Sequence, residues 1–317
     1  MFRDPGERNL MGQMALHAEM CDDSNDCITH QSIPNVHHTP DFVLWHRAFL
    51  FFHEQILSAL GNGPVGLPYW DWSSDRLCPP AFDAAKFDFG KHLAHSTNEL
   101  GDENFAQEQI LGVVAALRSL PPAEAAMQLF DEPIHTLVHG RFGWGRRSDL
   151  TTAAGDPAFY GHHGNLDRLA THIFEKGWPA PSGINYHFIG TDNKPICTKI
   201  DQFSNMASPY AGDGPIDTSG FEVRKMEDLR VAPPEGYSRV RTRLRFSAPL
   251  SMGLYQLHTN SGVRVGEIAS IHHHGGADFT VWLTTENYAK ARSEGLKTAP
   301  ESTSPEITGA LLVTKTG

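Results

Sequence analysis

The chain is poor in cysteine, in positive charge and in C-x-x-C motifs. It has 4 Cys among 317 residues and no C-x-x-C, so neither a disulfide scaffold nor a zinc ribbon is expected. Its 26 Lys and Arg stand against 37 Asp and Glu, and the net charge of −11 disfavours nucleic acid or an anionic membrane surface as a partner. The sequence therefore predicts a small ligand that is not polyanionic.

Long apolar runs are also lacking. No stretch of about 18 apolar residues is present, so no membrane-spanning helix is expected. The first ten residues, MFRDPGERNL, contain neither the apolar segment nor the cleavage site of a signal peptide. If the sequence is complete, a cytoplasmic protein is expected. Apolar residues make up 40% and charged residues 20% of the chain, which is typical of a folded globular protein.

The apolar spacing changes part-way along the chain. Helical periodicity covers most of residues 6–177. Residues 185–200 read as two short strands around an Asp-Asn turn, and short alternating segments follow from Tyr237. The sequence predicts an α+β multidomain protein, with a mainly helical bundle over 1–212, a Gly- and Pro-rich linker over 213–235 and a β-sandwich over 236–317.

Histidine is abundant, with 18 residues. His135 and His139 are one turn apart on a predicted helix, so their rings share a face and can bind one ion. His163 on the next predicted helix can supply a third ligand. The same reasoning gives a second cluster in the first part of the chain, formed by His17, His37 and His46.

Three imidazoles for each ion, with no carboxylate or thiolate, favour copper or zinc over magnesium, calcium or an iron–sulfur cluster. A lone pair of histidines one turn apart is more often a surface or packing feature. Two clusters in apolar helices favour metal binding, because six buried imidazoles without partners would leave many nitrogens unsatisfied. Spacing alone does not exclude His53, His162 or His172 as ligands.

Two segments resemble the type-3 copper proteins, which are the tyrosinases, catechol oxidases and hemocyanins. They are VHHTPDFVLWHR and DPAFYGHHGNLDR, the second preceded by H-x-x-x-H. The resemblance covers about residues 10–200 and implies a four-helix-bundle dicopper domain with two copper ions and O2 as co-substrate. Its pattern D-P-x-F-x-x-x-H-x-x-x-D implies His163 rather than His162 as the sixth ligand. The implied copper ligands are His17, His37, His46, His135, His139 and His163.

The pattern is most similar to the plant-type polyphenol oxidases. In that family a cysteine four residues after the first ligand forms a thioether with the second, which implies a Cys21–His37 bridge; a free buried cysteine is the alternative. Cys27 and Cys78 do not match the disulfides of the family, and the pairing of Cys27, Cys78 and Cys197 stays open. The last 90 or so residues resemble the C-terminal domain of these enzymes, which shields the copper entrance.

The resemblance also implies residues that act on the substrate. In the family an acidic residue before the fourth ligand, with an Asn after that ligand, holds a water that takes the phenol proton. Asp131, with Glu132 beside it, and Thr136 stand at these positions and imply catechol oxidation with weak monophenolase activity. Leu150 stands where a bulky gate residue is common and implies a wider entrance. Surface charge for Asp131 and a core position for Leu150 are the alternatives.

The implied activity is the oxidation by O2 of o-diphenols, small phenolic substrates, to o-quinones. Hydroxylation of monophenols and oxidation of o-aminophenols are further activities to test. A hemocyanin-like oxygen carrier has the same six ligands and differs by blocking substrate access, and a structural zinc protein is a third alternative. Arg47 and Asp167, each beside a ligand-bearing turn, are expected to pair, because burial of either charge alone would be costly.

Overall fold

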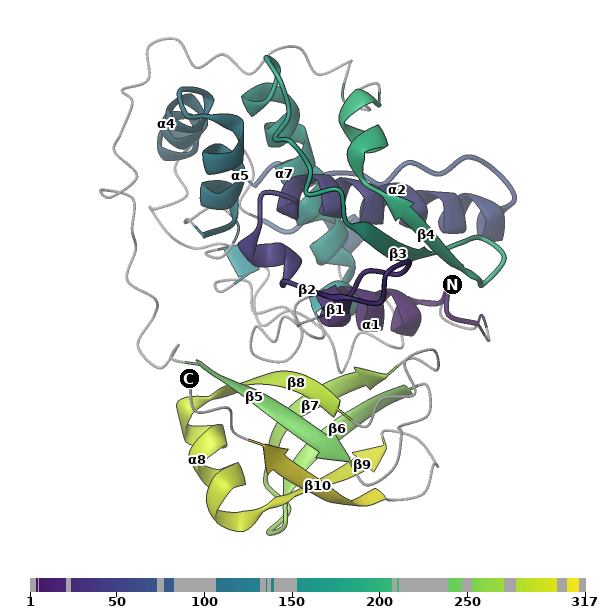
Figure 1. Ribbon diagram of the computed structural model, residues 1–317, viewed down its shortest axis with the longest axis vertical. Coiled ribbons are helices and arrows are strands. Elements are labelled where there is room, and N and C mark those ends of the chain that lie inside the picture. Colours follow the sequence, from purple (N-terminus) through teal and green to yellow (C-terminus); the bar gives the residue numbers. More distant parts are fainter. Residues whose placement is uncertain are drawn as a thin grey trace.

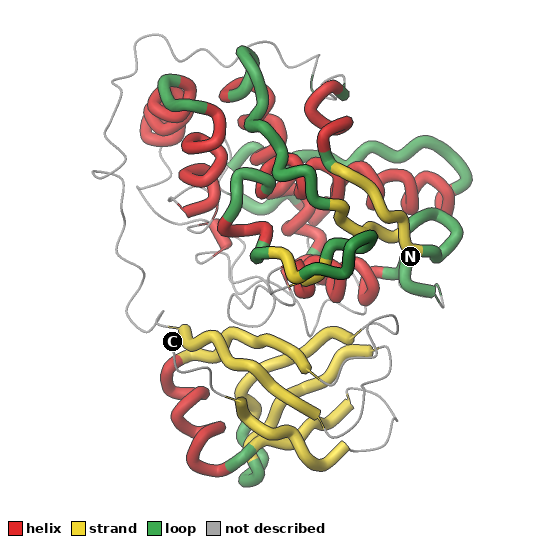
Figure 2. The backbone as a smooth tube through the Cα atoms, viewed as in Figure 1, coloured by secondary structure: helices red, strands yellow, loops and turns green. Residues whose placement is uncertain are grey.

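The computed structural model describes residues 4, 6–20, 24–72, 77–82, 107–131, 135, 138–139, 153–206, 210, 239–246, 253–270, 278–300 and 307–313. Helices fill the first part of the chain, and the C-terminal strands lie beside them as a separate layer (Figures 1 and 2). The predicted change from helix to strand is confirmed. The predicted linker, 213–235, lies outside the described residues, so the domain boundaries stay predictions.

The helical part contains long helices in which most side chains are buried. Its α-helices are α1 (Leu10–Met20), α2 (Phe42–Gly61), α4 (Gln107–Arg118), α5 (Pro122–Asp131) and α7 (Pro157–Ile173). Residues 135 and 138–139 are also helical. Helix α2 packs against α7, and α4 packs against α5 and α7. The helical part therefore forms a bundle around α2 and α7.

The ends of α2 and α7 follow from local sequence. Asp156 caps α7 by accepting a hydrogen bond from the backbone N–H of Ala158, and Pro157 occupies the first turn, where no N–H is needed. Helix α2 ends at Gly61, and Asn62, which follows it as the C-cap, adopts the left-handed conformation with φ 56°. Asparagine tolerates this conformation better than most residues. These caps fix where the histidine-bearing segments begin and end.

Short elements connect the helices. The 3₁₀ helices are η1 (Val36–His38), η2 (Pro80–Phe82), η5 (Ala153–Gly155) and η6 (Asp201–Asn205), and β1 (Ser24–Asn25) pairs with β2 (Ser32–Ile33). Strands β3 (Asn185–Ile189) and β4 (Pro195–Lys199) form an antiparallel hairpin with Phe188 opposite Ile196. The two strands predicted for residues 185–200 are thus confirmed.

The C-terminal part is a six-stranded antiparallel sheet with one helix. Its elements are β5 (Arg239–Phe246), β6 (Gly253–Thr259), β7 (Arg264–Ser270), β8 (Asp278–Thr284), α8 (Thr285–Glu294), β9 (Leu296–Pro300) and β10 (Ile307–Val313). The strand order is β7-β6-β9-β10-β5-β8. The two edge strands, β7 and β8, lie against each other, so the sheet is rolled. The predicted β-sandwich of two separate sheets is not confirmed.

Helix α1 joins the two parts of the structure. It packs against β7 on one side, and it also contacts η5 and β3 of the helical part. Figure 1 shows α1 on the side of the helical part that faces the sheet. Its sequence, LMGQMALHAEM, has buried residues on all faces. The C-terminal sheet is therefore seated on the helix that carries His17.

A disulfide closes the helical part. Cys27 and Cys197 are bonded, with their Cα atoms 5.9 Å apart and a sequence separation of 170 residues. The carboxylate of Asp26 accepts hydrogen bonds from the backbone N–H groups of Ile28, Thr29 and Asn185. These bonds hold the pKa of Asp26 well below its ordinary value. The loop after α1 is thus fixed to β3 and β4.

In the described parts of the chain, no helix is long and apolar enough to cross a membrane.

Candidate metal centre

Two groups of buried histidines lie inside the helical part. In each group the candidate ligand atoms all lie within 4.8 Å of one another, and every side chain is at most 4% exposed. The first group is His17, His37 and His46, and the second is His135, His139, His162 and His163. The structure therefore brings together all six histidines that the sequence predicts as ligands, with His162 in addition.

In the first group, hydrogen bonds at Nδ1 orient the rings of His46 and His37. The Nδ1 of His46 lies 2.8 Å from the carbonyl oxygen of Phe42, and the Nδ1 of His37 lies 3.2 Å from the Oδ1 of Asn35. Because both oxygens only accept, each Nδ1 carries the proton and each Nε2 keeps its lone pair. This is the arrangement in which a metal-binding histidine is fixed by its second nitrogen.

The second group spans two helical segments. His135 and His139 lie four residues apart, with ring centroids 4.4 Å apart. The Nε2 of His139 lies 3.2 Å from the Nε2 of His163, which α7 carries. Two ring nitrogens that face each other at this distance converge on one small space. An ion in that space would accept a lone pair from each of them.

The two groups adjoin each other. The rings of His46 and His163 are stacked, with centroids 4.4 Å apart and planes 9° apart. His46 belongs to the first group and His163 to the second, so ions bound by the two groups would be neighbours. Aromatic side chains close the space around both groups: Phe42 lies 4.5 Å from His46, and Phe159 lies 4.1 Å from His163, between ring centroids.

His162 differs from His163 in its hydrogen bonding. The indole N–H of Trp72 donates to the Nδ1 of His162 over 3.1 Å. In a neutral ring the proton is then on Nε2, so neither nitrogen presents a lone pair to an ion. The other two competing histidines, His53 and His172, belong to neither group. This geometry favours His163 over His162, which spacing alone leaves open.

Burial makes the histidines neutral. Desolvation lowers the pKa values of His46, His135, His139 and His163 well below the ordinary value, and neighbouring imidazoles lower them further. Neutral imidazole is the form that binds metals. The Nε2 of His46 is buried and has no hydrogen-bond partner in the described part of the chain. A metal ion would satisfy this nitrogen, so the residues fit a metal centre.

Behind the histidines lies a buried ion pair. The guanidinium of Arg47 lies 3.4 Å from the carboxylate of Asp167, and the two side chains are 4% and 6% exposed. The hydroxyl of Tyr210 donates to the same carboxylate over 3.1 Å. Burial raises the pKa of Asp167 to about 6, and the Arg47 charge offsets only part of this effect. The expected pairing of Arg47 with Asp167 is confirmed.

Other predicted site residues are not described. Asp131 is the last residue of α5, but its side chain lies outside the described residues, as do Cys21, Thr136 and Leu150. The Cys21–His37 thioether, the water-holding role of Asp131 and Thr136, and the gate role of Leu150 therefore stay predictions.

Comparison with known proteins identifies the family. A sequence model of the tyrosinase family, described as the common central domain of tyrosinase, matches residues 8–113 and 88–174, which together are more than half of the chain. The chain belongs to the tyrosinase family. Family membership and the two adjoining histidine groups together establish a dinuclear type-3 copper centre.

Curated relatives include both oxygen carriers and plant oxidases. A hemocyanin G-type (units Oda to Odg) of Enteroctopus dofleini is 32% identical over 164 residues, which are 43% of this chain and 6% of that protein. The (+)-larreatricin hydroxylase of Larrea tridentata is 25% identical over 203 residues, 51% of this chain and 35% of that protein. The polyphenol oxidase of Vitis vinifera is 24% identical over 205 residues, which are 52% of this chain and 34% of that protein. The chain thus spans about a third or less of these relatives.

The fold of this tyrosinase-family chain is also similar to a solved structure. A latent aurone synthase (polyphenol oxidase) from a natural source superposes with a TM-score of 0.50 and 16% sequence identity, covering 99% of this chain and 86% of that one. The likeness concerns the fold. The relatives thus include a plant polyphenol oxidase, the class of enzyme that the sequence resembles.

Proposed function

We propose that this chain is a polyphenol oxidase that oxidises o-diphenols to o-quinones with O2. The observation that carries the proposal is the stack of His46 on His163, with centroids 4.4 Å apart, which makes two histidine groups neighbours. Bound copper would supply the redox chemistry, in which one O2 takes four electrons from two diphenols and leaves as two waters. The proposed copper ligands are His17, His37 and His46 for one ion, and His135, His139 and His163 for the other.

The task of the chain is to hold the ligands still and to exclude water. The ring of Phe42 packs on His46 and lies 4.9 Å from His135, between centroids. Phe159 packs in the same way on His163 and lies 4.8 Å from His17. Each phenylalanine therefore contacts histidines of both groups. These contacts restrict ring rotation and keep bulk water away from the reacting oxygen.

Copper content and turnover of the full chain test the proposal. We expect two coppers per chain, and O2 uptake with quinone absorbance on addition of catechol, measured before and after limited proteolysis. His46→Ala is expected to lose copper and turnover. His53→Phe is the matched control, because it removes a buried histidine from the same helix outside both groups. Zinc in place of copper would contradict the proposal.

The choice of His163 as ligand has its own test. His163→Ala is expected to lower the copper content by one ion. His162→Asn is expected to keep two coppers, because the amide oxygen of asparagine can accept the Trp72 N–H in place of Nδ1. Loss of copper in His162→Asn with retention in His163→Ala would reverse the assignment.

A hemocyanin-like oxygen carrier is the second candidate. The hemocyanin G-type match, at 32% identity, favours it. A carrier would bind two coppers and O2 and give no quinone with catechol, even after proteolysis. Because a carrier and an oxidase share the same ligands, catechol turnover rather than metal content distinguishes them.

The Cys21–His37 thioether is part of the proposal. It would fix one copper ligand covalently and leave the chain lighter by two hydrogen atoms. After complete reduction and denaturation, we expect alkylation of three of the four cysteines, with Cys21 protected. Alkylation of all four would exclude the bridge.

Substrate preference is proposed from Asp131, Thr136 and Leu150. A threonine holds a water less firmly than the asparagine that is common in the family, so monophenol hydroxylation is expected to be weak. Thr136→Asn is expected to raise monophenol hydroxylation relative to catechol oxidation, and Leu150→Phe to raise the KM for bulky phenols. Turnover of o-aminophenols is measured in the same assay.

A further inference from the structure

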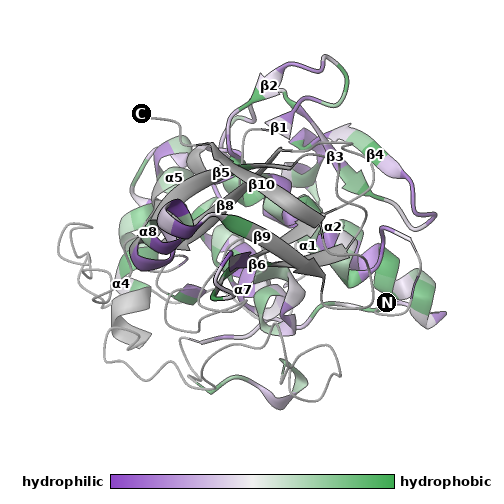
Figure 3. Ribbon diagram, turned by 90° about the horizontal axis from the view of Figure 1, so that it is seen from below, coloured by the Kyte–Doolittle hydropathy of each residue, from purple (hydrophilic) through white to green (hydrophobic). Residues whose placement is uncertain are grey.

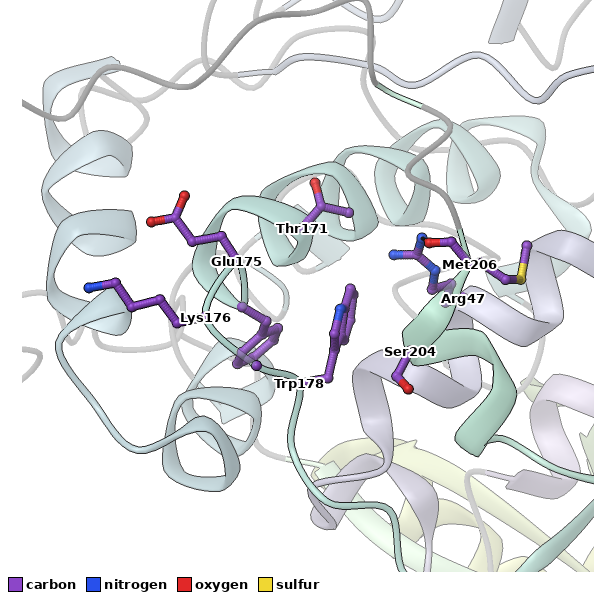
Figure 4. Close-up of a pocket in the computed structure, with 9 residues that line it drawn as sticks. Arg47, Thr171, Glu175, Lys176, Trp178, Ser204 and Met206 are labelled. Atoms are coloured by element: carbon purple, nitrogen blue, oxygen red, sulfur yellow. Dashed lines mark hydrogen bonds between the residues drawn. The ribbon is translucent and has the colours of Figure 1, made fainter.

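A pocket of about 390 Å³ opens beside the C-terminal end of α7. Helix α2, η6 and the turn after α7 contribute its lining, and it contains none of the histidines of the two groups. Figure 4 shows Arg47 and Trp178 side by side in this pocket, with Thr171 of α7 above them. The volume lies in the range of small-molecule sites.

Arg47 has hydrogen-bonding capacity to spare. Its guanidinium has five N–H donors in a planar fork. In the described residues it makes two long bonds, to Asp167 and to the carbonyl oxygen of Met206, each at 3.4 Å. Its Nε is buried without any hydrogen-bond partner in that part of the chain. A planar anion in the pocket would supply the acceptors that this buried cation lacks.

An aromatic wall stands beside the cation. The guanidinium carbon of Arg47 lies 4.8 Å from the centre of the Trp178 ring. The ring of Phe174 lies 5.3 Å from the same indole. The guanidinium covers one face of the indole, so a flat apolar body packs on the part of Trp178 that is left half-exposed, while its charged end reaches Arg47.

The charges at the pocket favour an anion, although the whole chain carries −11. The carboxylate of Glu175 at the rim is paired with Arg118. Lys176, also at the rim, is exposed, and Figure 4 shows its ammonium directed away from Arg47, so it adds positive potential without a second contact.

We propose that this pocket is a second small-molecule site, separate from the copper centre, which binds a small aromatic carboxylate. The carboxylate pairs with Arg47, and the ring lies on Trp178. The site does not depend on the proposed oxidase activity, because none of its residues belongs to the histidine groups.

The test uses phenylacetate and its uncharged analogue phenylacetamide, titrated by calorimetry into the copper-loaded full chain. Phenylacetate is expected to bind about tenfold more tightly or better, because only it forms a charge-assisted hydrogen bond with Arg47. Equal affinity for the two compounds, or no binding of phenylacetate at millimolar concentration, would overturn the proposal.

Thr171 gives a matched pair of variants. It lies four residues after Asp167 on α7, so both face Arg47, and its hydroxyl bonds only to the carbonyl oxygen of Arg168 among the described residues. Thr171→Glu places an internal carboxylate beside Arg47 and is expected to weaken phenylacetate binding about tenfold relative to Thr171→Gln, which has the same size and no charge. Equal affinities of the two variants would contradict the site.

Two further measurements make the test independent of folding and of the copper centre. The melting temperature of Thr171→Glu is expected to exceed that of Thr171→Gln, since the new carboxylate satisfies Arg47. Phenylacetate is also expected to bind the His46→Ala variant as it binds the unmodified chain. Binding that is lost in His46→Ala and kept in Thr171→Glu would place the ligand at the copper centre and overturn the proposal.

Discussion

His53 lies face to face with Tyr160, with ring centroids 3.9 Å apart and planes 17° apart. It stands on α2, two turns after His46, and is buried. Burial lowers the pKa of His53 from 6.5 to about 3, and its Nδ1 has no hydrogen-bond partner in the described residues. The ring is therefore neutral in the folded protein at a pH where the unfolded chain protonates it.

His53→Phe is expected to make the protein less sensitive to acid. Because the folded pKa is depressed, His53 costs stability as the pH falls from 6.5 toward 3, by up to about 5 kcal/mol at the acid end. Phenylalanine keeps the stack on Tyr160 without titrating. The free energy of unfolding of the metal-free chains is measured by urea at pH 8 and pH 4.5. An equal loss in both chains would contradict the assignment.

Asp167→Asn tests a pH dependence of stability with the opposite sign to that of His53. The folded pKa of Asp167 is raised from 3.8 to about 6, so the folded state keeps its proton when the unfolded state has lost it. The wild type should therefore lose up to about 3 kcal/mol relative to the variant as the pH rises from 4 to 7. The amide oxygen of asparagine can still accept from Arg47, and its N–H2 group can donate to the hydroxyl oxygen of Tyr210. The free energies of unfolding of both chains are measured at pH 4 and pH 7. A wild type that becomes more stable relative to the variant as the pH rises would show that the charge of Arg47 outweighs the burial of Asp167.

Gly12→Ala is expected to destabilise α1. A Cβ at this position would lie 1.7 Å from the carbonyl oxygen of Glu7, so the backbone before the helix must move. The expected loss is about 1–3 kcal/mol, with weaker copper retention because α1 carries His17. Gly63→Ala is the control, since a Cβ there meets nothing within 4 Å. Thermal melting and copper content of the two variants are compared, and equal behaviour would refute the predicted clash.

Removal of the Cys27–Cys197 disulfide is expected to lower stability. The double variant Cys27→Ser, Cys197→Ser frees a loop of 170 residues, and loss of such a bond costs about 2–5 kcal/mol. Cys78→Ser is the control, because Cys78 lies outside the disulfide. Urea unfolding without reductant gives the comparison. A Cys78→Ser variant that loses as much as the double variant would speak against this pairing.

The histidine clusters were predictable from local patterns, whereas the resemblance to the type-3 copper proteins implied copper rather than zinc. His135 and His139 share a helix face, and the D-P motif starts α7 with His163 in its second turn, so both features depend on nearby residues. Spacing alone did not choose between His163 and His162; the family motif D-P-x-F-x-x-x-H-x-x-x-D implied His163. The contact that supports this choice in the structure comes from Trp72, 90 residues away from His162 in the sequence, and no spacing rule contains it.

Contacts between residues that are far apart in the sequence limited the prediction of the rest of the fold. The strands β3 and β4 flank a short turn and were found, whereas Cys27 and Cys197 meet only through the fold. Helix α8 was missed for two reasons. Its sequence, TENYAKARSE, is largely hydrophilic, as its colours in Figure 3 show. It also follows β8 directly. The rolled sheet depends on β7 meeting β8, which alternation within each strand does not specify.

The packing of the C-terminal sheet against α1 has a consequence for solubility. Leu10, Leu16 and Met20 belong to the apolar core of the helical part. Met14 is buried outside that core, on a helix that also contacts β7. Cutting away the sheet would expose to water the face of α1 that now contacts β7. A trimmed form of the protein would then be prone to self-association, whatever the effect of trimming on the copper centre.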